Sequence, residues 1–131
     1  MLRVTSTLPA ETDQLIQRVI GCGIAVHKTL GSGYPEKAYT RALGLEFDVQ
    51  GIAYEREKLV RVIYRDKTVY RCRLDLVVGG QLIVEIKCVD SLLPVHRSQV
   101  LGYLRAAELR AGLLMNFKTG AMVDGVKRVV L

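Results

Sequence analysis

Three charged residues interrupt two otherwise apolar stretches of this sequence. Asp75 lies within LDLVV, while Glu85 and Lys87 lie two residues apart within LIVEIK. A charge inside an apolar strand is costly unless it is paired or bound to an ion. If the chain turns back between the two stretches, the two carboxylates converge, and their repulsion raises the pKa of one of them.

A divalent cation would relieve this repulsion, and carboxylate oxygens suit Mg²⁺ or Mn²⁺. Such an ion could activate water and stabilise an oxyanion, which is the general logic of phosphodiester hydrolysis. Lys87 would then help to orient the water and neutralise developing charge. An ion pair of Lys87 with Glu85 or Asp75 at the end of a sheet explains the same three residues equally well. No Ser-His-Asp, Walker or zinc pattern competes with these two interpretations.

The pair Gly79-Gly80 predicts the turn that would bring the carboxylates together, because this dipeptide is typical of a two-residue hairpin. It joins predicted strands over residues 68–78 and 81–89, and a third strand over 58–64 precedes them. One face of the last strand carries Ile83, Glu85 and Lys87. On the strand before it, we expect Leu74, Leu76 and Val78 to share one face and Asp75 to break the other.

Helical spacing of apolar residues over 13–30 and 94–110 predicts two helices, and another is expected from Pro35 to about residue 49. Short strands follow at 113–117 and 126–131. The order is therefore helix, helix, three strands, helix, two strands. This indicates an α/β (α+β) domain with a central mixed β-sheet flanked by helices. The length of 131 residues suits one domain over 1–131, with a flexible segment at 1–12.

The net charge of +6 suggests a polyanionic partner, and all of the excess lies after residue 54. Residues 55–84 hold seven basic and four acidic side chains, which would supply contacts to a nucleic-acid backbone. No apolar run is long enough for a membrane span and no secretory signal is recognisable. The three dispersed cysteines fit neither a disulfide framework nor a metal motif, so we expect a cytoplasmic protein.

The pattern Asp…Glu-x-Lys on hairpin-linked strands, after a helical Glu, resembles the PD-(D/E)XK nuclease superfamily. More narrowly, the chain resembles the GxxExxY family of small predicted nucleases, whose naming motif stands here as GYPEKAY at residues 33–39. HRSQVLGYL carries Gln99 and Tyr103 at the spacing of the Q-x-x-x-Y helix of exonuclease branches. The resemblance spans about residues 13–131, nearly the whole chain.

The resemblance implies that Asp75 and Glu85 bind the metal, with the Ile86 carbonyl as a further ligand. It makes Lys87 the catalytic lysine and Glu36 a metal-positioning acid. The residues that would support the site or contact nucleic acid are Gln99, Tyr103, Tyr39, Arg73 and His96. Each has a simpler alternative. Glu36 complements a helix dipole, Tyr39 packs in the core, Gln99 and Tyr103 border an amphipathic helix, and His96 is a solvated loop residue.

The function implied is a metal-dependent nuclease that uses Mg²⁺ or Mn²⁺ on nucleic acid, with DNA as the first expectation, and leaves a 5′-phosphate. A non-catalytic nucleic-acid-binding or regulatory module with the nuclease fold is the main alternative. An interaction protein whose charges form only ion pairs is a third. Such a small nuclease has little surface with which to grip a duplex, which favours a homodimer with two sites.

Overall fold

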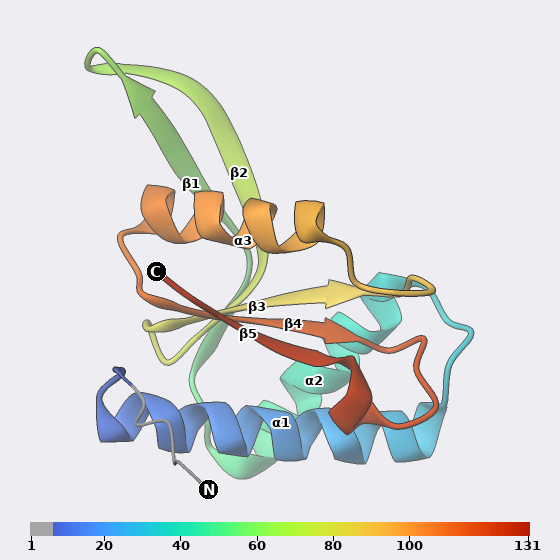
Figure 1. Ribbon diagram of the computed structural model, residues 1–131. Helices are drawn as coiled ribbons and strands as arrows, with labels where there is room; N and C mark the ends of the chain where they lie inside the picture. Colours follow the sequence, from blue (N-terminus) through green and yellow to red (C-terminus); the bar gives the residue numbers. More distant parts are fainter. Residues whose placement is uncertain (1–6) are drawn as a thin grey trace, which may run out of the picture.

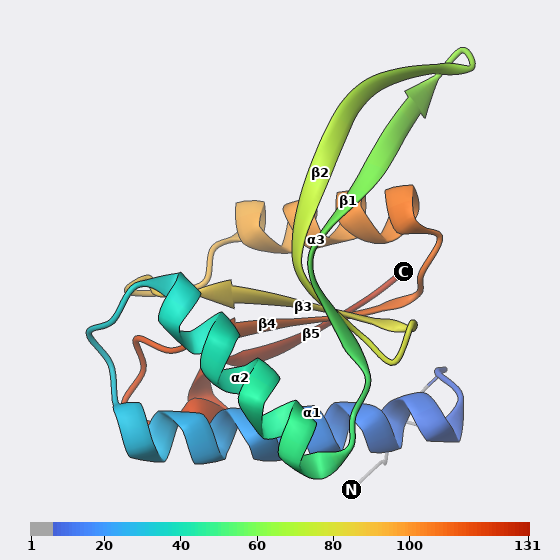
Figure 2. The ribbon, with the colours of Figure 1, turned by 180° about the vertical axis from the view of Figure 1, so that it is seen from behind.

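The computed structural model describes residues 7–131, in which a mixed five-stranded sheet lies between helices (Figures 1 and 2). The sheet order follows the chain, β1-β2-β3-β4-β5, and only β3 and β4 run parallel. Helices α1 and α2 cover one face of the sheet and α3 covers the other. The elements are α1 (Ala10–Leu30), α2 (Glu36–Gln50), β1 (Tyr54–Tyr64), β2 (Lys67–Val78), β3 (Leu82–Lys87), α3 (Pro94–Ala107), β4 (Ala111–Asn116), a 3-10 turn (Met122–Gly125) and β5 (Val126–Val130).

This arrangement confirms the predicted α+β fold, and the differences lie at element ends. Helix α1 begins at Ala10 because Pro9, which has no N–H to satisfy, stands just before its first turn. The first three residues of α1 thus come from the segment expected to be flexible, while residues 1–6 lie outside the described part. Helix α2 begins directly after Pro35, so that Glu36 is its first residue, and ends at Gly51 in the left-handed conformation.

The two faces of the sheet form separate apolar clusters. Leu76 packs with Val78, Val84 and the buried residues of α1 and α2, whereas Ile83 packs with the buried residues of α3. The prediction that Leu74 shares the face of Leu76 is wrong, since Leu74 belongs to the cluster beneath α3. The reason is that β2 pairs with β3 only over Leu76–Val78 and then turns away from the sheet (Figure 1).

The loop between β2 and β3 sets the register of the two strands. Val78 pairs with Leu82, so the loop has three residues rather than the two predicted from Gly79-Gly80. Gln81 stays in the loop, where its side-chain carbonyl accepts a 2.6 Å hydrogen bond from the Thr12 hydroxyl. If this register is continued by one residue pair beyond Leu76 and Val84, Asp75 lies opposite Glu85, and the two side chains share one face of the sheet. A two-residue turn would have placed the two carboxylates on opposite faces.

Strands β1 and β2 continue together beyond the sheet as a two-stranded arm, which we define as residues 57–73. The arm projects past α3, and pairing along it extends to Tyr64 and Lys67 next to the tip (Figures 1 and 2). The tip residues Arg65 and Asp66 both have positive φ, as the tight hairpin turn requires. The arm begins at the level of Asp75, so its root lies beside the two carboxylates.

Asn116, which is buried at the end of β4, holds the segment that follows Lys87. Its side-chain carbonyl accepts hydrogen bonds from the Val89 and Lys118 amides, and its amide group donates to the Val89 carbonyl at 2.8 Å. We expect Asn116→Ala to lower the free energy of unfolding by about 2–3 kcal/mol, because buried backbone groups lose their partners. Urea denaturation measures this effect. The exposed Gln14→Ala should stay within about 0.5 kcal/mol of the unmodified protein, and an equally small effect of Asn116→Ala would contradict the assignment.

Candidate active site

Asp75 and Glu85 exchange hydrogen bonds with each other's strand where β2 and β3 separate. The Asp75 amide donates to Glu85 Oε1 at 3.0 Å, and the Ile86 amide donates to Asp75 Oδ2 at 2.9 Å. The regular strand pairing stops one residue pair earlier, at Leu76 and Val84. The carboxylates therefore replace backbone partners at this point. The structure brings them together as expected, but through a three-residue loop and not through the predicted two-residue turn.

Burial and proximity make Glu85 hold a proton tightly. Its side chain is only 5% exposed. The pKa of Glu85 is raised to about 8. Burial is the main cause, and the negative charge of Asp75 and the hydrogen bond between the two carboxyl groups add to it. The Asp75 amide and the charge of Lys87 oppose this rise. At neutral pH the pair thus favours a bound proton, which is the position that a cation would take.

Lys87 lies at the edge of the pair without an ion pair to it. Its ammonium group is 3.5 Å from Gln99 Oε1. Four ion pairs are found among residues 7–131, and none of them includes Lys87. The alternative of a Lys87 ion pair at a sheet end is therefore not what the structure shows, and the ammonium group lies near Gln99 of α3 instead.

Helix α3 brings Gln99 and Tyr103 over the same face of the sheet. Tyr103 is half-buried, and its pKa is raised by burial first and then by the nearby charges of Glu85, Cys72 and Asp75. Both residues line a groove of about 520 Å³ between α3 and the arm, which we call the arm groove. The prediction that both side chains point the same way agrees with this placement.

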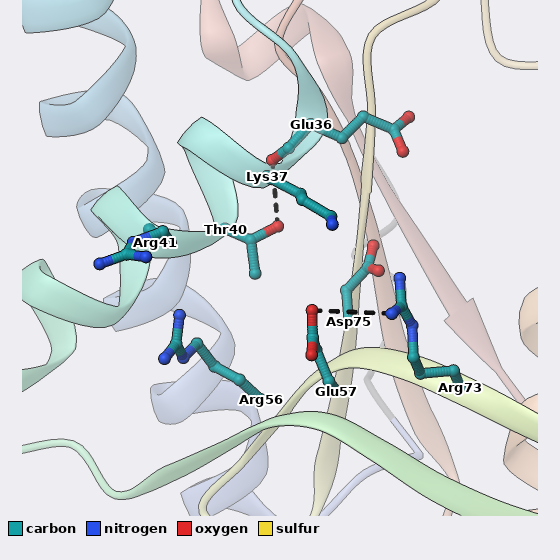
Figure 3. A pocket seen from close by; sticks show the side chains of 8 residues that line it. All are labelled: Glu36, Lys37, Thr40, Arg41, Arg56, Glu57, Arg73 and Asp75. Carbon is teal, nitrogen blue, oxygen red and sulfur yellow. Dashed lines mark hydrogen bonds and ion pairs between the residues drawn. The ribbon is translucent and has the colours of Figure 1, made fainter.

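A second groove opens on the other side of Asp75 and is rich in basic side chains. This basic groove has a volume of about 470 Å³ and lies between α2 and the root of the arm (Figure 3). Its lining residues are Glu36, Lys37, Thr40, Arg41, Arg56, Glu57, Arg73 and Asp75. Arg73, expected to contact nucleic acid, lies here and forms a 3.7 Å ion pair with Glu57. Lys37 and Arg41 were not predicted as site residues, although their spacing of four residues places both on one face of a helix.

Glu36 lines the same groove as Asp75 but does not join the carboxylate pair. Its side chain is exposed, and its carboxylate is turned away from the middle of the groove (Figure 3). Its charge adds to burial in raising the pKa of the Cys88 thiol. Within residues 7–131, no three His, Cys, Asp or Glu side chains are grouped closely enough to hold a metal ion. The close acidic pair thus consists of Asp75 and Glu85 without Glu36.

Tyr39 and His96 form their hydrogen bonds with nearby chain segments and not with the two carboxylates. Tyr39 is fully buried, donates a 2.6 Å hydrogen bond to the Gly31 carbonyl and stacks on Phe117. It thereby fixes the loop that precedes Glu36. His96 is not the solvated loop residue of the simpler interpretation, because it lies in the first turn of α3. There its Nδ1 accepts a 2.9 Å hydrogen bond from the Leu93 amide.

The carboxylate pair fits a small divalent cation. Two carboxylates with hard oxygen donors lie together, and the pKa of Glu85 is raised. Mg²⁺ is often bound by one or two carboxylates, with water and phosphate completing its shell. Ile86 follows Glu85 directly and already directs its amide to Asp75. Its carbonyl stays a predicted ligand. The donor set is thus sufficient for Mg²⁺ or Mn²⁺ even without Glu36.

The fold and this site together define an α+β domain that presents two carboxylates and a lysine where central strands diverge. A family model described as the PD-(D/E)XK nuclease superfamily matches residues 13–129. The chain therefore belongs to the PD-(D/E)XK nuclease superfamily. Membership supports a nuclease-like function in general, nucleic acid as the class of substrate, and the divalent metal ions that such nucleases generally use. A search of curated proteins found no match. Among residues 7–131, no helix has the length and apolar character of a membrane span.

Replacing Glu85 by glutamine should make the metal-free protein more stable at neutral pH. The pKa of Glu85 is about 8 in the folded protein and near 4.5 when unfolded, so the unfolded chain releases the proton first as pH rises. The free energy of unfolding therefore falls between about pH 4.5 and 8, by on the order of 2–3 kcal/mol at neutral pH. Glutamine keeps a carbonyl for the Asp75 amide and has no charge to bury.

Urea unfolding in EDTA across this pH range measures the effect. Glu85→Gln should remove most of the decline with pH, while Glu11→Gln, an exposed change on α1, should leave it in place. An unmodified protein that is equally stable at pH 5 and pH 8 would contradict the assignment.

Proposed function

We propose that this protein is a metal-dependent nuclease that hydrolyses phosphodiester bonds of nucleic acid, with DNA as the expected substrate, and leaves a 5′-phosphate. Asp75 and Glu85 would hold Mg²⁺ or Mn²⁺ together with the Ile86 carbonyl, and Lys87 would be the catalytic lysine. The observation that carries this proposal is the pair of carboxylates at the strand divergence, where buried Glu85 and half-buried Asp75 each accept a hydrogen bond from the other's strand. We also propose that the chain falls within the GxxExxY family, on the motif at residues 33–39.

The chemistry divides between the metal ion and the side chains around it. When bound, the ion supplies concentrated positive charge that makes water more acidic and stabilises a developing oxyanion. The Lys87 ammonium group, which forms no ion pair with either carboxylate, would orient the attacking water and neutralise charge on the phosphate. Gln99, 3.5 Å from that ammonium group, positions it.

The basic groove provides the surface for the phosphate backbone near the reacting bond. The groove is lined around Asp75 by Lys37, Arg41 and Arg56. Arg73 also lines it and forms an ion pair with Glu57. Contacts of this kind hold the backbone by charge and do not distinguish base sequence. Glu36, whose carboxylate is turned from the centre, would act on the metal only through a change of rotamer or an intervening water.

A second candidate function is a nucleic-acid-binding or regulatory module that retains the fold without turnover. The position of Glu36 outside the acidic pair favours it, because one predicted site acid is then not in place. The two functions differ in metal binding. The nuclease requires Mn²⁺ at Asp75 and Glu85, whereas the module predicts salt-dependent nucleic-acid binding without it.

The decisive experiment is a cleavage assay on single-stranded DNA, double-stranded DNA and RNA with Mg²⁺, Mn²⁺ or EDTA. Products with 5′-phosphates that depend on Mg²⁺ or Mn²⁺ are expected. A crystal soaked in Mn²⁺ should show anomalous density between Asp75 and Glu85. No cleavage of any substrate, together with no density at the pair, would refute the nuclease proposal and favour the module.

Three other features stay predictions from the sequence. They are a single domain over residues 1–131, a homodimer that supplies two sites, and a cytoplasmic location. Sedimentation of the purified protein would test the dimer directly, since the masses of one and two chains differ by a factor of two.

A further inference from the structure

The arm exposes apolar and aromatic side chains that the body of the protein does not cover. Five of them are more than half exposed, namely Leu59, Ile63, Tyr64, Val69 and Tyr70. A two-stranded hairpin without a third strand is only marginally stable in water. Exposed apolar groups on such an element indicate a surface that binds a partner.

The arm is also strongly basic. Residues 57–73 contain six basic and two acidic side chains, a net charge of +4 within the chain's total of +6. Lys58 and Arg73 are held in ion pairs. Arg61, Arg65, Lys67 and Arg71 form no ion pair with any residue in the described part of the chain. These four cations are thus available to a polyanion.

At the tip, charge and aromatic surface occur together. The Arg65 guanidinium lies 5.7 Å from the centre of the Tyr64 ring, and that ring is exposed. Adjacent cations and aromatic rings suit nucleic acid, because cations bind phosphates while rings stack on unpaired bases. A carboxylate-rich protein would use the cations but would gain nothing from stacking.

The arm groove runs between the arm and α3, and one of its lining residues, Gln99, is 3.5 Å from the Lys87 ammonium group. Arg61 and Val62 line it from the arm, and Gln99 and Tyr103 line it from α3. Burial raises the pKa of Tyr103, and the nearby charges of Glu85 and Asp75 add to this rise, so Tyr103 lies near the pair. A strand of nucleic acid at the carboxylates could therefore follow this groove onto the arm.

We propose that the arm is a nucleic-acid-binding element, which receives a single strand leaving the candidate active site. Arg61, Arg65, Lys67 and Arg71 bind its phosphates, and Tyr64 stacks on a base. The inference rests on the proposed function for the class of substrate. A second copy of the chain is a poor occupant, since two arms of charge +4 would repel each other.

The test measures binding of a short fluorescent DNA strand, and of its duplex, to the full chain in EDTA at several salt concentrations. Arg65→Gln with Lys67→Gln should weaken single-strand binding about tenfold and reduce the salt dependence by about 1.4 in the logarithmic slope. The control is Lys28→Gln with Arg110→Gln, two exposed cations away from both grooves. It should change affinity less than about twofold.

Variants of Tyr64 separate stacking from apolar contact. Tyr64→Ala and Tyr64→Leu should each weaken binding about fivefold or more, and Tyr64→Phe should restore it, because only an aromatic ring stacks on a base. If Leu restores binding as well as Phe does, stacking by Tyr64 is refuted. If the duplex binds more tightly than the single strand and Tyr64→Ala binds DNA as well as the unmodified protein does, the assignment to a single strand is overturned.

Other occupants of the arm give different results in the same experiments. Equal loss of binding in the arm and control variants, or no binding by the unmodified protein, would overturn the proposal. So would displacement of the DNA by polyglutamate as readily as by unlabelled DNA. If the unmodified protein sediments as a dimer and the arm variants sediment as monomers, the arm mediates self-association instead.

The nuclease proposal and the proposal for the arm can each fail while the other holds. Mn²⁺ binding by calorimetry should be equal in the arm variants and the unmodified protein. If the arm variants lose DNA binding and the unmodified protein never cleaves, the proposed role of the arm is supported and the nuclease proposal is refuted. If every arm variant cleaves and binds DNA with unaltered affinity, the nuclease proposal is supported and the proposed role of the arm is refuted.

Discussion

Replacing Asp75 by asparagine is expected to abolish Mn²⁺ binding and to reduce cleavage by about a thousandfold or more. The change removes one of only two carboxylates in the acidic pair. Losing the ion removes several kcal/mol of charge stabilisation, and each 1.4 kcal/mol corresponds to about tenfold in rate. The asparagine carbonyl can still accept the hydrogen bond of the Ile86 amide, so the variant should fold.

The matched control is Asp90→Asn, which removes a highly exposed carboxylate three residues beyond Lys87. It should bind Mn²⁺ and cleave like the unmodified protein. Calorimetry and a cleavage time course on one substrate give both quantities. Asp75→Asn that retains full cleavage would place the metal site elsewhere, whatever the stability of the variant.

Replacing Lys87 by methionine is expected to reduce cleavage about 10²- to 10³-fold while Mn²⁺ binding persists. Methionine keeps the apolar length of the side chain but removes the ammonium group that would orient the water and neutralise charge on the phosphate. Metal binding should hold or tighten, because a positive charge beside the carboxylates has been lost. This separation of binding from turnover distinguishes a catalytic lysine from a metal ligand.

Lys87→Arg should recover only part of the rate, since it keeps the charge in a planar group of different reach. Lys28→Met on α1 is the control for removal of one exposed charge and should leave the rate unchanged. If Lys87→Met loses Mn²⁺ binding in parallel with cleavage, its role is structural. Unchanged cleavage would exclude Lys87 from the reaction.

The parts of the fold that depend on local pattern were predictable from the sequence. Periodic apolar residues identified α1 and α3, and the alternation along LIVEIK placed Glu85 and Lys87 on one face. The Gly79-Gly80 dipeptide located the turn but not its length. Gln81 remains in the loop through a hydrogen bond to Thr12, 69 residues away in the sequence, and no local pattern contains that information.

Side-chain direction and the divergence of strands were harder to predict. Nothing in TVYRCRLDLVV marks the residue at which β2 leaves β3, because this depends on twist and on packing beneath α3. Leu74 was assigned to the wrong face for that reason. Glu36 was expected near the metal on motif spacing alone, which fixes the helix position but not the rotamer. Asn116 was not singled out, although a lone polar residue in an apolar strand is a usable signal.

Strand β2 belongs both to the arm and to the carboxylate pair, and this has a mechanical consequence. Its backbone runs without interruption from Lys67 beside the tip to Asp75 at the root. On β1, Glu57 lies between the residues that pair with Leu74 and Leu76 and adopts a positive φ, so the backbone of β1 departs from regular strand geometry at the level of Asp75. Asp75, the proposed metal ligand, therefore lies on the strand that carries the arm. A force on the tip would act through β2 on the spacing of Asp75 and Glu85, so a strand bound by the arm would also affect the proposed site of cleavage.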